Sequence, residues 1–126
     1  MKTQEIIIKD LPKVSSNKIY AGAHWSKRNK LKDSYLLLTK MPFKKLMPVE
    51  GLVDLTFDFY FTRNALDSSN CSYMAKMLED CLVEWKVLKN DTIKYVRSIK
   101  LISSKSKLKE ADYCVITINE ICQKEF

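Results

Sequence analysis

Hydrophobic and polar residues alternate most regularly over residues 50–62, which predicts a β-strand with one buried face. The residues expected on that buried face are Val53, Leu55, Phe57, Phe59 and Phe61. Shorter runs rich in β-branched residues predict three further strands, over residues 4–9, 95–103 and 112–121. The pattern therefore indicates a sheet of about four strands.

Two longer stretches, residues 24–40 and 68–86, have the spacing of amphipathic helices. Their apolar faces would contain Trp25, Leu31, Tyr35 and Leu38 in the first helix, and Met74, Leu78, Leu82 and Trp85 in the second. We expect Trp25 to be a core residue and His24 to be a cap or surface residue. Asp67, Ser68 or Ser69 would cap the second helix, because short polar side chains bond to the free N–H groups of a first turn.

Loop-forming residues mark residues 11–23 and 41–49, and a basic loop, a candidate hairpin tip, is expected over residues 103–110. The order strand, helix, strand, helix, strand, strand predicts the α+β class, with two layers and two main helices. A chain of 126 residues can bury a core of its own, so we predict a single domain covering residues 1–126.

Composition narrows the environment in which the chain would work. The four cysteines form no C-x-x-C pair and there is one histidine, which argues against a zinc site. The first residues have no apolar core typical of a signal peptide, and no apolar run approaches the length of a membrane span. We expect a cytoplasmic protein with no membrane segment, whose cysteines are reduced and mostly buried.

Positive charge is concentrated in the first third of the chain. Residues 1–46 contain 11 Lys or Arg and 3 Asp or Glu, a balance of +8, whereas the whole chain carries +7. This asymmetry favours a polyanionic partner such as nucleic acid, although a solubilising surface would have the same composition.

Residues with catalytic chemistry are concentrated in residues 63–97. One helical face would contain Ser69, Tyr73, Lys76 and Asp80, with Asp67 before the helix and Asp91 in a polar turn after it. If the fold brings them together, their oxygens are the ligands that Mg²⁺ prefers, and an ammonium would neutralise charge on a phosphate. Structural roles remain open for each: Asp67 as a helix cap, Lys76 and Asp80 as an ion pair, and Asp91 as a turn residue.

The same stretch resembles the signature region of the RusA family of Holliday junction resolvases, which is common in prophages. The matching positions are Arg63, residues 66–70, Lys76, Asp80, residues 87–88, residues 90–91 and residues 94–96. Residues 17–32 also resemble the family's N-terminal region, so the resemblance covers most of the chain.

The resemblance implies a RusA-like fold and a Mg²⁺-dependent endodeoxyribonuclease that resolves Holliday junctions and other branched DNA in recombination and repair. Mn²⁺ would be a possible substitute for Mg²⁺. Asp67, Lys76 and Asp91 would be the catalytic residues, and Asp67, Asp80 and Asp91 the metal ligands. Asn70 takes the place of the asparagine that follows the family's paired aspartates.

Three positions depart from the family pattern. Ser69 stands where the family has its second metal aspartate, Asn90 replaces the first aspartate of the turn pair, and Lys86 replaces a glycine. Loss of a carboxylate weakens Mg²⁺ binding, unless Asp80 on the same helix face supplies the charge. The alternative function is therefore a catalytically weakened protein of the same fold that binds branched DNA.

The expected DNA contacts are mostly to phosphates, which position DNA without reading its sequence. They are Lys27, Arg28, Lys30, Lys32, Arg63 and Asn70, with Lys44 and Lys45 extending the basic surface. Cutting two opposed strands of a four-way junction calls for two related active sites, so we expect a homodimer. A third hypothesis is a small interaction module whose basic face binds an acidic protein.

Overall fold

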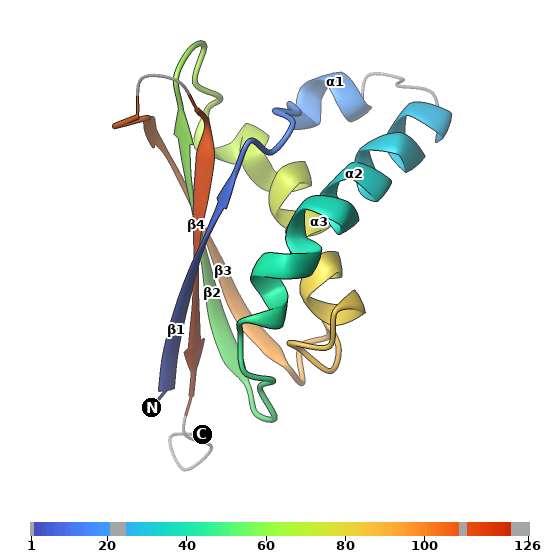
Figure 1. Ribbon diagram of the computed structural model, residues 1–126, viewed down its shortest axis with the longest axis vertical. Coiled ribbons are helices and arrows are strands. Elements are labelled where there is room, and N and C mark those ends of the chain that lie inside the picture. The colour runs from blue at the N-terminus through green and yellow to red at the C-terminus, as the bar shows by residue number, and fades with distance from the viewer. Residues whose placement is uncertain (1, 21–24, 109–110, 122–126) are drawn as a thin grey trace.

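The computed structural model describes residues 2–20, 25–108 and 111–121, which form one four-stranded sheet with helices against one face (Figure 1). The strands are β1 (Lys2–Lys9), β2 (Val53–Phe61), β3 (Val96–Lys105) and β4 (Tyr113–Glu120). The helices are α1 (Ser16–Tyr20), α2 (Trp25–Lys44), the 3₁₀ turn η1 (Ser68–Cys71) and α3 (Ser72–Glu84). The predicted α+β class, with four strands and two main helices in two layers, is confirmed.

The strands lie in the order β1-β4-β2-β3, with β2 and β3 parallel and the other neighbours antiparallel. A parallel pair needs a long crossover connection, and η1 with α3 supplies it. Phe61 and Lys105 are register partners at the ends of the parallel strands, and the Ser106 N–H donates to the Phe61 carbonyl at 2.8 Å. The loops after β2 and β3 therefore leave the sheet together, at what we call the carboxyl edge.

The central strand β2 has the alternation expected from its sequence. Its odd-numbered residues are at most 2 % exposed and pack against the helices, whereas the residues between them are half-buried on the opposite face. The aromatic rings of Phe57, Phe59 and Phe61 follow one another along this buried face with centroids 6.4 and 6.2 Å apart. This strand is the base on which α3 and its polar residues are positioned.

Helix α2 is longer than predicted, because it continues through Pro42 to Lys44, where a loop was expected over residues 41–49. A proline inside a helix usually ends it by removing a backbone donor. Here Phe43 is 1 % exposed, and burial of its ring holds the last turn in place.

The buried stripe of α2 also differs from the expected one. Trp25 is 67 % exposed and Leu38 37 % exposed, so the prediction that Trp25 is a core residue is wrong. The buried residues follow i, i+4, i+8 spacing at Tyr35, Thr39 and Phe43, a stripe that begins further along the helix. His24 lies outside the described residues.

The segment predicted as a loop over residues 11–23 contains the short helix α1, while residues 21–23 lie outside the described part. Ser16 at its start is 5 % exposed, and its hydroxyl accepts a hydrogen bond from the Tyr73 N–H at 3.0 Å. The cap of α3 thus comes from α1. Asp67 occupies the N-cap position of η1, as predicted for the start of this helical segment, but its side chain makes no capping bond.

The strands β3 and β4 lie on opposite sides of β2, so the basic loop between them is not a hairpin tip. Of the cysteines, the three in the described residues are free and buried, and Cys122 lies outside them. Burial raises the pKa of Cys71 to about 11, as expected for an unreactive core thiol. Among the described helices, none has the length and apolar character needed to cross a bilayer.

Candidate metal and DNA site

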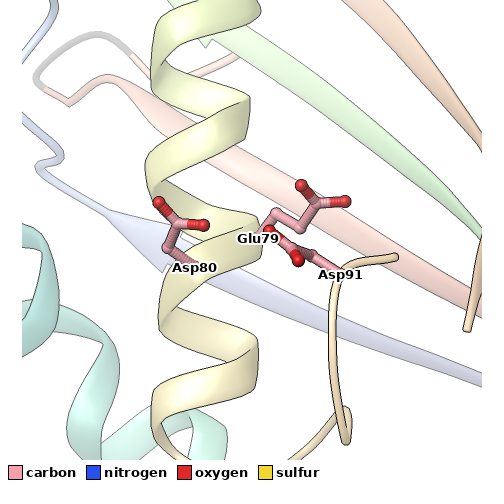
Figure 2. A group of neighbouring side chains, drawn as sticks. All are labelled: Glu79, Asp80 and Asp91. Atoms are coloured by element: carbon pink, nitrogen blue, oxygen red, sulfur yellow. The ribbon is translucent and has the colours of Figure 1, made fainter. Parts of the chain in front are cut away.

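Three carboxylates surround the ammonium group of Lys76. Its Nζ lies 2.6 Å from Asp91 Oδ2 and 3.2 Å from an oxygen of each of Glu79 and Asp80. Glu79 and Asp80 project from neighbouring positions of α3, and Asp91 extends toward them from the loop after the helix (Figure 2). We call Lys76, Glu79, Asp80 and Asp91 the acidic cluster.

Local packing places each member of the acidic cluster. On α3, Lys76 precedes Glu79 and Asp80 by three and four residues, the spacing at which helical side chains meet. The opposite face of α3 is buried through Met74, Leu78 and Leu82, which sets the rotation of the helix.

The loop that contains Asp91 begins where α3 ends. Lys86 ends the helix with φ of 63°, a left-handed conformation that favours glycine, the residue that the RusA pattern has at this position. The side chain of Asn90 accepts a hydrogen bond from the Asp91 N–H at 2.7 Å and so stabilises the turn. These contacts direct the Asp91 carboxylate back toward α3.

The charged groups of the cluster shift one another's pKa values. Partial burial of Lys76 acts to lower the pKa of its ammonium, but hydrogen bonds to the three carboxylates outweigh it and raise that pKa above its usual range. The hydrogen bond from Lys76 holds the pKa of Asp91 below that of an ordinary aspartate. Glu79 is 4 % exposed, and its burial raises the pKa of the carboxyl despite the nearby ammonium.

The donor set of the cluster fits a hard divalent cation. Ligand oxygens of Glu79, Asp80 and Asp91 all lie within 4.8 Å of one another, and Mg²⁺ gathers oxygens about 2.1 Å from its centre. These three residues would hold the ion, and Lys76 would have to withdraw from between them. A pocket of about 210 Å³ beside Asp80 and Asp91 is also lined by Lys32 of α2.

Asp67 is not part of this group of metal-capable carboxylates within the described residues. It lies at the carboxyl edge, between β2 and η1, and its carbonyl accepts a hydrogen bond from the Asn70 N–H at 2.8 Å. Ser69 is exposed in η1. The structure therefore brings together Lys76, Asp80 and Asp91 and leaves Asp67 outside their cluster.

Some of the residues expected to contact DNA are exposed, whereas others make hydrogen bonds within the protein. Lys27 and Lys30 are exposed on α2, whereas the guanidinium of Arg28 donates to the Ile19 carbonyl at 3.3 Å and so connects α2 to α1. Arg63 is exposed at the carboxyl edge. Asn70 is half-buried, and its carbonyl accepts a hydrogen bond from the Ser16 hydroxyl at 3.1 Å.

Sequence reasoning missed Glu79 as a member of the cluster. Its position three residues after Lys76 was a usable signal, but a glutamate beside the apolar stripe is ordinarily solvated. It also missed Lys13 and Lys18, which line one pocket together with Lys27 in the folded protein.

Comparison with known proteins identified no relative of this chain in the two searches that follow. No protein-family model matches the chain, and a search of curated proteins found no significant match. Functional assignment therefore depends on the geometry of these residues and on the resemblance of residues 63–97 to the RusA signature.

Proposed function

We propose that the protein is a Mg²⁺-dependent endodeoxyribonuclease that cuts branched DNA, including four-way junctions. The observation that carries the proposal is the acidic cluster, in which Lys76 and Asp80 on α3 meet Asp91 from the following loop. These are three of the residues that the RusA resemblance marks as metal-binding or catalytic. Asp91 lies fifteen positions after Lys76 in the sequence, so their contact is a product of folding.

The carboxylates of Glu79, Asp80 and Asp91 would bind the metal ion. When bound, Mg²⁺ supplies an activated water and stabilises charge on the phosphodiester. Glu79 is buried and its raised pKa disfavours ionisation, so a cation would stabilise its charged form. Metal binding and deprotonation of Glu79 are therefore coupled.

Lys76 would act on the phosphate. Its raised pKa keeps it protonated at neutral pH, and its side chain is 53 % exposed, so the residue lies at the surface, where DNA could approach it. With the carboxylates engaged by a bound cation, the Lys76 ammonium would be free to turn toward the oxygens of the scissile phosphate. There it would stabilise the charge that develops in the transition state.

The basic residues of α2 and the carboxyl edge would hold the DNA backbone. Lys27, Lys30 and Arg63 are exposed, while Lys32 lines the pocket beside the cluster. A homodimer would present two clusters to the two strands of a junction. Such a protein would work in the cytoplasm, on DNA undergoing recombination or repair.

A second candidate is a protein that binds branched DNA without cutting it. The favouring observation is that Lys76 already contacts all three carboxylates of the cluster, while Ser69 supplies no carboxylate. An ion would then have to displace an ammonium. In this case DNA binding would be sensitive to salt and independent of metal.

The deciding experiment compares cleavage of a labelled four-way junction and a linear duplex in Mg²⁺, Mn²⁺ or EDTA. The nuclease proposal requires paired, metal-dependent nicks near the crossover that Asp91→Asn abolishes. Asp33→Asn, which changes an exposed aspartate on α2, is the matched control and should cut normally.

Junction binding without cutting would instead support the second candidate, most strongly if Ser69→Asp restored cleavage. Absence of both binding and cutting would reject both candidates and favour the module that binds an acidic protein.

A further inference from the structure

A second pocket lies at the other end of the helical layer, between α1, the first half of α2 and the loop after β2. Its volume is about 360 Å³. Three lysines line it, Lys13, Lys18 and Lys27, and the described lining contains no aspartate or glutamate. We call it the lysine pocket. Three ammonium groups without a carboxylate among the lining residues create a positive potential, which attracts an anion.

The lysine pocket also has apolar lining residues, Val14, Ile19, Leu31 and Leu66, which we call its floor; Ser15 and Asn64 complete the lining. Val14 and Ile19 belong to the core, and Leu31 and Leu66 are half-buried against it. A lining that combines buried apolar residues with lysines suits a ligand that is flat and apolar at one end and anionic at the other.

Hydrogen bonds within the protein hold the walls of this pocket in place. Lys13 Nζ donates to the carbonyls of Arg63 at 2.9 Å and Asn64 at 3.3 Å, which ties the loop after β2 to the segment before α1. The bond from Arg28 to the Ile19 carbonyl joins α2 to α1. A site with fixed walls loses little conformational entropy on binding.

The size and position of the pocket narrow the choice of ligand. A volume of about 360 Å³ is at the lower end of the range for small-molecule sites, so it admits one small group and not a duplex. Asn64 and Leu66 bring the loop after β2, at the carboxyl edge, into the lining of the pocket, and Leu66 immediately precedes Asp67.

We infer that the lysine pocket binds a single nucleotide, with its base on the apolar floor and its phosphate between Lys18 and Lys27. The inference rests on the proposed function, because branched DNA offers such a nucleotide where base stacking is interrupted at an open crossover. Extruding a base from an interrupted stack costs less than extruding one from a continuous duplex. Recognition of a branch would then come from occupancy of this pocket, and the surrounding lysines would add affinity for any DNA.

The test measures binding of a four-way junction that carries 2-aminopurine at the crossover, alongside a linear duplex. Leu31→Trp fills the floor without changing charge, and Lys18→Ala with Lys27→Ala removes two of the three ammonium groups. Lys2→Ala with Lys100→Ala, two exposed lysines on strands β1 and β3, is the matched charge control.

We expect Leu31→Trp to weaken junction binding about tenfold, to suppress the fluorescence change of 2-aminopurine and to leave duplex binding unchanged. The Lys18 and Lys27 double variant should weaken junction binding more than the control does. For this double variant, the slope of log K for junction binding against log salt concentration should become shallower by about 0.9 for each phosphate that the protein no longer binds. A Leu31→Trp protein that binds the junction as tightly as the wild type would overturn the inference, whether or not the junction is cut.

The two proposals can fail separately. Pocket-dependent binding of the junction without metal-dependent cleavage would reject the nuclease and retain the nucleotide site. If the wild type bound no branched DNA, the probe would be free dAMP, followed by NMR chemical shifts. Shifts at Leu31 and Leu66 that Leu31→Trp abolishes would support a mononucleotide site, and absence of shifts would reject it.

Discussion

The acidic cluster and the lysine pocket both gather charged side chains, but they balance charge in opposite ways. In the cluster, one ammonium contacts three carboxylates, so acidic groups outnumber the one cation that faces them within the protein. In the lysine pocket, three ammonium groups share a lining without a carboxylate among the described residues. The difference indicates that the first region attracts a cation, which would have to displace the Lys76 ammonium, whereas the second attracts an anion.

The two regions also differ in how the chain assembles them. The acidic cluster comes from one helix and the loop that follows it, within residues 76–91. The lysine pocket combines residues from 13 to 66, in three segments that meet only in the folded protein. Ser16 connects the two regions, because it begins α1 beside the pocket and caps α3, which contains the cluster. Four tests examine this division, from the largest expected effect to the smallest.

Asp91→Asn should abolish the chemistry of the cluster and spare the lysine pocket. Loss of a group that holds the metal beside the reacting phosphate is expected to slow junction cleavage by about 10²–10³-fold, while junction affinity remains within about twofold. Single-turnover cleavage and a binding titration measure the two effects, with Asp33→Asn as the control. A large loss of affinity in Asp91→Asn would show that the two regions do not act separately.

Ser16→Ala should loosen the connection between the regions. Its hydroxyl accepts from the Tyr73 N–H and donates to the Asn70 carbonyl, and it is buried. Loss of a buried cap is expected to lower the free energy of unfolding by about 1–2 kcal/mol, measured by urea denaturation. Ser34→Ala, which removes a hydroxyl bonded within α2, should cost far less. Equal losses in the two variants would argue against Ser16 as a cap.

Arg28→Ala and Lys30→Ala should separate a structural cation from one that only attracts DNA. Arg28 donates to the Ile19 carbonyl, so its loss is expected to lower the free energy of unfolding by about 0.5–1.5 kcal/mol. Lys30→Ala should leave stability within about 0.5 kcal/mol of the wild type and reduce only the salt-sensitive part of DNA binding. Thermal unfolding measures the stability of the two variants, and a salt titration measures their DNA binding. The opposite ranking in stability would argue against Arg28 as a stabilising link between α2 and α1.

Acidification should weaken the acidic cluster by a small amount. The pKa of Asp91 is lowered in the folded protein by the Lys76 hydrogen bond, so the contribution of this carboxylate is present above the unfolded aspartate pKa of about 3.9. It is lost as pH falls through the lower folded value. Since the pair is partly exposed, we expect an effect of no more than about 1 kcal/mol. The stability difference between wild type and Asp91→Asn should therefore shrink below a pH of about 4, and a constant difference would contradict this assignment.

The fold was predictable where side-chain periodicity and burial agree. The alternation along β2 and the stripe of Met74, Leu78 and Leu82 on α3 identify the two central elements, because each has one face in the core. The prediction of helix ends failed where a tertiary contact, burial of one ring or a hydrogen bond from a distant hydroxyl, outweighed the preference of the local sequence. Phe43 extends α2 past Pro42, and Ser16 caps α3 in place of Asp67.

The candidate site was predictable only in part. Lys76 and Asp80 share a helix face, so their proximity follows from helical geometry. The approach of Asp91 depends on the turn at Lys86 and Asn90, and Glu79 joins the cluster although its position borders the core. Asp67, which the RusA resemblance marks as a metal ligand, is outside the cluster because η1 and the start of α3 lie between them.

By itself, the sequence determined the α+β class, the buried face of each central element and the concentration of positive charge in the first third of the chain. These properties depend on local periodicity and composition, which need no knowledge of distant neighbours. Only the tertiary structure decided that β3 pairs with β2, that Asp91 meets Lys76, and that Lys13, Lys18 and Lys27 line one pocket. Such contacts join residues far apart along the chain, and their geometry is set by the packing of whole elements against the common core.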